Sequence, residues 1–129
     1  MFKMDKMVLI LWVIAVHSFF TGVALIIIPG HFLKYFGIIT PNHSFFQTQG
    51  GIFHIVMCVA YTMAAIKPEN NPNIILFIII VKFIAAFFLS VYYFFIEPAW
   101  IIIFSAIFDG SMGLIVLLLN IENKRSFQQ

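Results

Sequence analysis

Trp100–Ile121 reads WIIIFSAIFDGSMGLIVLLLNI, and this stretch decides the fold. It is long enough to form a helix that crosses the hydrocarbon layer of a membrane, which takes about 20 apolar residues. Asp109 lies near its middle. A carboxylate at that depth is costly, so it should face protein or water and have a partner. Lys82, inside the preceding apolar run, is the best candidate for that partner.

The composition of the whole chain indicates an integral membrane protein. Of its 129 residues, 63% are hydrophobic and 9% are charged, whereas a soluble domain averages about 25% charged residues. A soluble chain of this length could not hide so much apolar side chain. A net charge of +2 without a basic tract excludes the usual electrostatic footprint of nucleic-acid binding. The single cysteine excludes an internal disulfide and a multi-cysteine metal site.

Four apolar runs of about 20 residues divide the chain. Residues 1–129 should therefore form a single transmembrane domain, with spans at about 8–28, 45–66, 73–96 and 99–120. Proline, glycine, asparagine or charged residues stand at each boundary, as they do where helices stop. The short links make neighbouring spans antiparallel. The predicted fold class is all-α, an integral membrane antiparallel four-helix bundle with up-down-up-down topology.

Basic residues predict the orientation of this bundle. With four spans, both termini share one side of the membrane with the linker that contains Lys67. That side carries Lys3, Lys6, Lys67, Lys124 and Arg125, and the opposite side carries only Lys34. The positive-inside rule then places both termini in the cytoplasm, and we expect a multi-pass protein of the cell inner membrane. The outer linker, 31–44, forms either a short interfacial helix or an ordinary loop.

Each span carries one ionisable residue well inside its apolar run: His17, His54, Lys82 and Asp109. At 1.5 Å per residue, these groups lie roughly 14, 18, 12 and 16 Å from the cytoplasmic ends of their spans. We therefore expect one polar layer across the bundle, to which each helix contributes one group. Residues that share the helical face of each group are mostly small, so the interior should be small and polar, and large Ile and Phe should cover the exterior.

Lys82 and Asp109 are expected to pair, because an unpaired charge at this depth costs about 3 kcal/mol. The pair either fixes helix register or serves as a proton relay or substrate anchor. Gln49 opens the second span and would polarise the outer mouth of a pocket, or it would cap and pack the helix start.

The sequence identifies no cofactor. His17 and His54 could supply the two axial ligands of a haem, but one histidine on each helix is a weak signal for it. A metal site has little support from one carboxylate without a cysteine cluster. Cys58 follows His54 by one turn, yet a lone intramembrane cysteine is usually a packing residue, so a catalytic role is the least supported.

The order of polar landmarks resembles a known group of proteins. A first span ending in proline is followed by Gln49-Gly50-Gly51, a Lys-Pro turn, Lys82 in the third span and Asp109 in the fourth. This order resembles the small four-span bacterial membrane proteins of unknown function that are grouped with the DoxX-like families. The resemblance implies a four-helix membrane bundle, and DoxX proteins are associated with redox partners. Similarity in shape to sterol-binding four-span proteins implies an amphipathic ligand, by analogy of fold alone.

Three functions follow as hypotheses. In the first, the polar layer of His17, His54, Lys82 and Asp109 binds a small amphipathic or lipid-like molecule, or the chain supports a membrane protein partner. In the second, the chain is a small proton or ion transporter that acts as a homo-oligomer. In the third, it is a structural subunit in which the layer only sets helix register.

Overall fold

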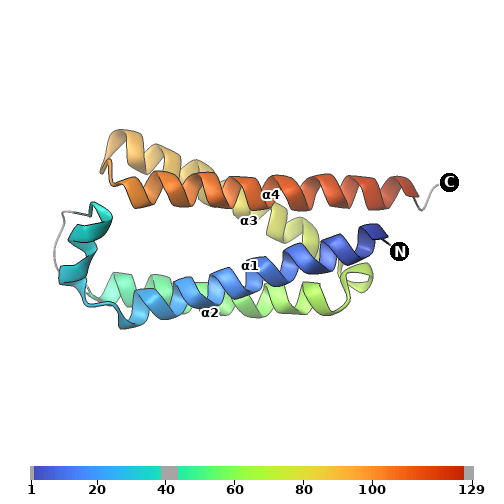
Figure 1. Ribbon diagram of the computed structural model, residues 1–129, viewed down its shortest axis with the longest axis horizontal. Coiled ribbons are helices and arrows are strands. Elements are labelled where there is room, and N and C mark those ends of the chain that lie inside the picture. The colour runs from blue at the N-terminus through green and yellow to red at the C-terminus, as the bar shows by residue number, and fades with distance from the viewer. Residues whose placement is uncertain (1, 39–43, 127–129) are drawn as a thin grey trace.

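The computed structural model describes residues 2–38 and 44–126, and four long helices account for most of them (Figure 1). The helices are α1 (Phe2–Ile27), α2 (Ser44–Ile66), α3 (Pro72–Phe95) and α4 (Trp100–Ser126). Each contains a segment long and apolar enough to cross a membrane: Lys6–Ile27, Phe45–Ile66, Pro72–Phe95 and Trp100–Arg125. The all-α class and the four predicted runs are thus confirmed, although α4 continues past its predicted end at Asn120. Basic residues favour this extension, because Lys124 and Arg125 lie at the negative end of the helix dipole.

Polar side chains and prolines end the helices where the sequence predicts. After α1, Pro29 cannot continue the helix, and the Gln47 side chain donates hydrogen bonds to the free carbonyls of Leu25 (2.9 Å) and Ile28 (2.6 Å). After α2, the 3-10 turn η2 (Pro68–Asn70) leads into Asn71, whose side chain donates to the Lys67 carbonyl at 2.9 Å. These caps satisfy carbonyl groups that would otherwise lack a partner in the helix ends.

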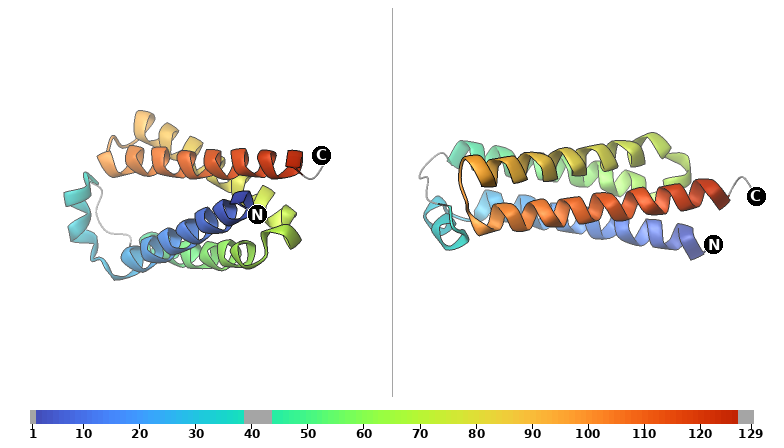
Figure 2. Two further views of the ribbon diagram at one scale, coloured as in Figure 1. Left: turned by 45° about the vertical axis from the view of Figure 1, so that its right-hand side comes forward. Right: turned by 90° about the horizontal axis from the view of Figure 1, so that it is seen from above.

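The four helices form two hairpins that diverge like the arms of a V. α1 packs along α2, and α3 packs along α4. Seen from above, α4 lies over α1 and α3 over α2 (Figure 2). We call the end that holds both termini and η2 the terminal end, and the opposite end the η1 end, after the 3-10 helix η1 (Gly30–Phe36). The hairpins meet at the terminal end and separate toward the η1 end, so α2 and α3 touch much less than either touches its hairpin partner.

Glycines allow close contact within each hairpin. A Cβ atom on Gly51 would lie 2.7 Å from the Gly22 carbonyl oxygen, and one on Gly22 would lie 2.7 Å from the Gly51 oxygen. In the other hairpin, a Cβ atom on Gly113 would lie 3.0 Å from Cβ of Lys82. Small residues of this kind let two helices approach in a lipid environment, where no hydrophobic force drives them together.

The core of the molecule occupies only the terminal half. Within every helix, its members lie on the terminal side of the ionisable residue. They are Met7, Leu11, Ile14, Ala15, Met57, Tyr61, Ala64, Ala65, Ile75, Ile78, Ile79, Met112 and Val116. The prediction of a small and polar interior is therefore wrong for the terminal half, because large apolar side chains pack against one another there. The prediction failed because hydropathy does not separate a side chain that faces lipid from one that faces another helix.

The linker helix η1 docks on the start of α4. The rings of Phe36 and Trp100 lie 6.0 Å apart between centroids. Gly37, which ends η1, has a φ of 83°, and a Cβ atom there would lie 3.2 Å from Cδ1 of Trp100 and 3.3 Å from Cα of Ala99. Of the two predictions for this linker, the short helix is the one observed, with Phe32 and Tyr35 exposed; residues 39–43 lie outside the described residues.

Gly37→Ala should loosen η1 from α4. The left-handed conformation costs an L-residue about 1–2 kcal/mol, and the new methyl group would crowd Trp100. Gly30→Ala is the matched control, because its nearest new contact is Gln47 Oε1 at 3.9 Å. Limited proteolysis of detergent-purified protein should cut the η1 segment faster in Gly37→Ala and at the wild-type rate in Gly30→Ala. Equal rates in the two variants would contradict this docking.

Candidate functional site

A buried ion pair lies where the two hairpins begin to separate. Lys82 Nζ on α3 donates to Asp109 Oδ1 on α4 at 2.5 Å, so the pair expected from the sequence is present. Lys82 is 4% exposed and Asp109 is 9% exposed. Nζ also lies 5.4 Å from the ring centroid of Tyr61 on α2, within the range of a cation–π interaction. Lys82 therefore ties α3 to α4 by charge and to α2 through an aromatic ring.

The two histidines lie beside this pair. On α2, the backbone carbonyl of His54 accepts a hydrogen bond from the Ser18 hydroxyl of α1 at 2.9 Å, and His54 Nδ1 lies 3.3 Å from the same oxygen. Electrostatic interactions join both His17 and His54 to Lys82 and Asp109. The structure thus brings the four predicted residues of the layer together, each on its own helix.

His17 has an unusual arrangement of neighbours. Its ring packs against Phe108 of α4, with 4.8 Å between ring centroids. Its Nε2 lies 3.5 Å from Oγ1 of Thr21, one turn further along α1. Its Nδ1 is buried, and among the described residues it has no hydrogen-bond partner. A buried polar atom without a partner is uncommon and costs free energy, so this nitrogen calls for an explanation.

Gln49 does not join the layer. It is exposed on α2, because it stands five positions before His54 and therefore points about 140° away from it around the helix. Gln47 is the glutamine that contacts another helix, through its bonds to the end of α1. Gln47 therefore packs the start of α2 against the end of α1, and a role of Gln49 at the mouth of a pocket stays a prediction.

Three contributors were missed in the sequence: Ser18, Tyr61 and Phe108. Ser18 and Phe108 are each the immediate neighbour of a predicted layer residue. Tyr61 lies two turns after His54 on the same helical face, so helical spacing already places it on the inner side of its helix. Ser18 and Phe108 carry no charge and a tyrosine phenol is neutral near pH 7, so the cost of a buried charge does not mark any of the three.

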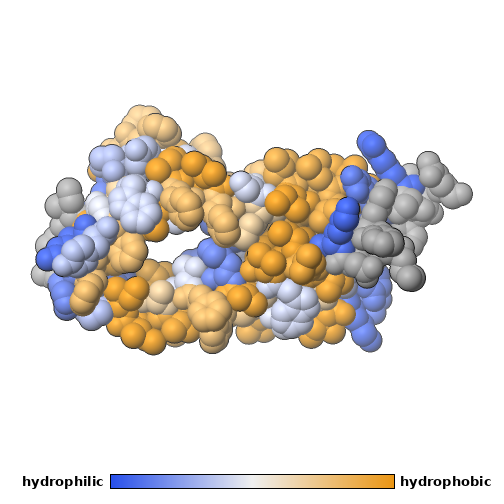
Figure 3. Space-filling view, in the orientation of Figure 1, coloured by the Kyte–Doolittle hydropathy of each residue, from blue (hydrophilic) through white to orange (hydrophobic). Residues whose placement is uncertain are grey.

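A cleft opens from the layer toward the η1 end. Figure 3 shows the molecule hollowed between the two hairpins, with hydrophobic surface on both sides and a hydrophilic patch at the inner edge of the hollow. The hollow lies on the η1 side of the packed core, where α1 and α2 diverge from α3 and α4. The layer is thus the polar floor of an apolar cleft.

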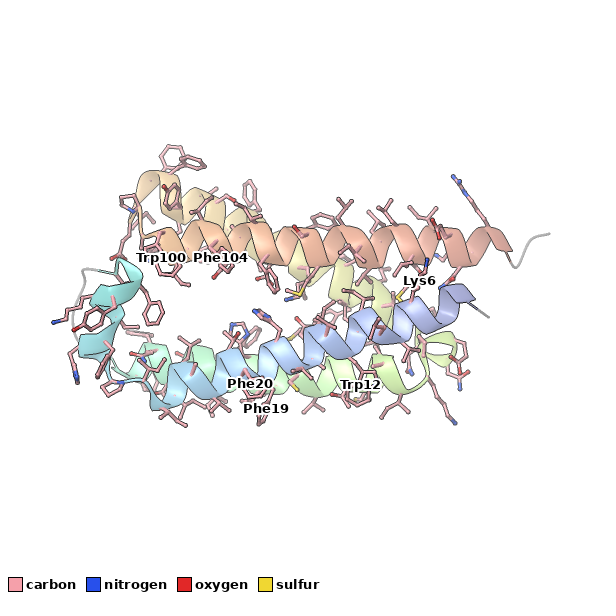
Figure 4. The ribbon with its side chains drawn as sticks, in the orientation of Figure 1. Lys6, Trp12, Phe19, Phe20, Trp100 and Phe104 are labelled. Atoms are coloured by element: carbon pink, nitrogen blue, oxygen red, sulfur yellow. The ribbon has the colours of Figure 1, made fainter. Side chains whose placement is uncertain are left out.

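Aromatic rings from α4 and η1 line one wall of this cleft. Phe104 and Phe108 stack with 6.2 Å between centroids and 12° between planes, and Trp100 lies one turn before them. Phe36 extends the series at the η1 end. Trp100 and Phe104 lie on the side of α4 that faces the other hairpin (Figure 4). We call Phe36, Trp100, Phe104 and Phe108 the aromatic ladder. The sequence pattern, which predicts large Ile and Phe on the exterior, gives no sign that these rings line the cleft.

The geometry gives no support to a bound haem. His17 and His54 come from α1 and α2, which are held in direct contact by Ser18 and by the pair Gly22 and Gly51. The two histidines therefore come from helices in direct contact, and not from opposite sides of the cleft. Among the side chains that the structure describes, those of residues 6–38 and 45–125, no group of three or more His, Cys, Asp or Glu is placed to hold a metal ion.

A comparison with protein families, curated proteins and solved structures finds no match for this chain. The resemblance to the DoxX-like families therefore stays a prediction. The cleft and its polar floor are the features from which the function can be inferred.

Proposed function

We propose that this protein is a multi-pass protein of the cell inner membrane, with both termini in the cytoplasm, and that it binds one lipid-like molecule in the cleft between its hairpins. The carrying observation is that an apolar cleft ends at a polar floor. Such a cleft matches an amphipathic molecule, whose chain lies along the aromatic ladder and whose polar end reaches His17 and His54. Pockets of this kind, mostly apolar with a few convergent polar groups, are the usual form of small-molecule sites.

The position of the cleft supports entry from the bilayer. The hairpins separate on the η1 side, and η1 itself covers the axial end of the gap by docking on Trp100. With the four helices in a membrane, the open sides of the gap would face lipid. A molecule dissolved in the bilayer would then enter sideways and would not have to cross water.

The packed core favours binding over transport. A transporter needs a polar or hydrated route from the layer to both sides of the membrane. Between the layer and the terminal end, the described core is apolar and includes Leu11, Ile14, Ile78 and Val116, each fully buried. The packed core therefore separates the layer from the terminal end, and the cleft lies on the other side of the layer. The binding proposal needs no second subunit, since the cleft is formed by a single chain.

Tryptophan fluorescence tests the proposed binding. In Trp12→Phe, Trp100 in the cleft is the only tryptophan, and in Trp100→Phe the only one is Trp12, on α1 nearer the terminal end (Figure 4). A long-chain alcohol brominated in the middle of its chain quenches a tryptophan that it touches. We expect saturable quenching of Trp100 at low probe-to-detergent ratios, and only weak, non-saturable quenching of Trp12. Equal, non-saturable quenching of both would mean that the probe only partitions into the micelle.

A further inference from the structure

The charges of the layer restrict the head group of the ligand. Lys82 and Asp109 are in direct contact and neutralise one another, and both are buried. In their neutral forms, the imidazoles of His17 and His54 add no charge. A carboxylate, phosphate or ammonium group brought to this floor would lack a counter-charge in a medium of low polarity, unless it broke the existing pair. A neutral head group needs no counter-charge and leaves the ion pair of Lys82 and Asp109 intact.

The unpartnered nitrogen of His17 restricts the head group further. A neutral imidazole has one N–H donor and one acceptor nitrogen, and which is which depends on the tautomer. If Nε2–H faces Thr21 Oγ1, then Nδ1 is an acceptor and needs a donor; in the other tautomer it needs an acceptor. A hydroxyl group donates and accepts, so it satisfies Nδ1 in either tautomer. A carbonyl satisfies only one.

From these two observations we infer that the ligand of the cleft is a neutral lipid-like alcohol, whose hydroxyl group hydrogen-bonds to His17 Nδ1. The inference rests on the proposed function and names the chemical class of its ligand. Apolar ring or chain carbons of the alcohol lie along Trp100 and Phe104, and the hydroxyl lies at the floor.

Phe108 controls the approach to this nitrogen. Its ring lies against the His17 imidazole, and Nδ1 is buried, so the hydroxyl reaches it when the Phe108 side chain rotates. Phe108 is 38% exposed, so neighbouring groups do not enclose its ring completely. The ligand hydroxyl then takes the position of the Phe108 ring and forms a hydrogen bond with His17 Nδ1, which a phenyl ring cannot do.

A series of probes with one chain and different ends tests the inference. Saturated chains of equal length, ending in a hydroxyl, methyl, carboxylate or trimethylammonium group, compete with the brominated alcohol for Trp100 in the Trp12→Phe protein. The alcohol should bind roughly five- to tenfold more tightly than the alkane, the factor for one hydrogen bond. Both charged chains should bind more weakly than the alkane. This series uses no variant at the site, so it does not depend on whether a site variant folds.

His17→Phe supplies the matched variant. It keeps an aromatic ring against Phe108 and removes Nδ1, so the alcohol and the alkane should bind equally well, with the alkane unchanged. His31→Phe makes the same substitution at an exposed position of η1 and should keep the preference for the alcohol. If no chain in the series quenches or competes at Trp100, the proposed binding itself fails. If binding occurs but a charged chain competes as well as the alcohol, or His17→Phe keeps the preference, only the neutral-alcohol inference is overturned.

Discussion

Lys82→Met should lower the free energy of unfolding by about 3–5 kcal/mol, the loss expected when one partner of a buried ion pair is removed. Asp109 would remain 9% exposed, without the ammonium group that neutralises it. Methionine has a side chain of similar length, so the loss would come from charge and not from a cavity. Unfolding in mixed micelles with increasing sodium dodecyl sulfate, followed by circular dichroism, measures the effect.

The double variant Lys82→Met with Asp109→Leu is the control for this prediction. It removes both charges together, and such replacements of buried pairs by apolar residues are often neutral or stabilising. We expect its stability to lie close to that of the wild type. Alcohol binding should persist as well, because His17 and the aromatic ladder are unchanged. A double variant as unstable as Lys82→Met would show that the charges themselves hold the helices in register.

Gly51→Ala should separate α1 from α2 and destabilise the protein by about 1–3 kcal/mol, the usual cost of overpacking. The new Cβ atom would lie 2.7 Å from the backbone oxygen of Gly22 and 2.7 Å from Cγ1 of Ile26. A flexible side chain can move away, but a backbone oxygen can move only if the helix moves. The same unfolding measurement records the effect.

Gly50→Ala is the neighbouring control. Its new Cβ atom would meet only Leu25 Cδ1, at 3.9 Å, which is an ordinary contact. Alanine is favoured over glycine inside a helix by about 0.8–1.0 kcal/mol, so this variant should be slightly more stable than the wild type. The two adjacent substitutions should therefore have opposite signs. Equal losses would mean that the helices do not meet at Gly22 and Gly51.

The strongest sequence predictions came from the cost of polar groups in an apolar run. That cost identified Lys82 and Asp109 as a pair and placed the histidines beside them, because burying a charge leaves few alternatives. Runs of about 20 apolar residues likewise predicted the four helices. Both arguments depend on a large local energy, and they need no knowledge of how the helices are arranged.

The arrangement of the hairpins could not be predicted in this way. In lipid, Phe104 on the cleft wall and Phe87 on the outer surface have the same hydropathy, so the pattern does not tell them apart. The packing of α1 against α2 depends on which small residues meet, and Gly22 and Gly51 meet across two helices, which the spacing within one helix does not reveal. That contact also decides which face of α2 packs against α1. Gln47 lies on this face and bonds to the end of α1, and Gln49 does not lie on it.

Photolabelling locates the ligand most directly. A long-chain alcohol with a diazirine in its chain is bound to the detergent-purified protein, irradiated, and mapped by peptide mass spectrometry, with the unmodified alcohol as competitor. The account predicts competed labelling of the aromatic ladder, at Trp100, Phe104 and Phe108. Labelling spread over outward-facing residues such as Phe94 and Phe95, 71% and 82% exposed, and unaffected by the competitor, would contradict a binding site in the cleft.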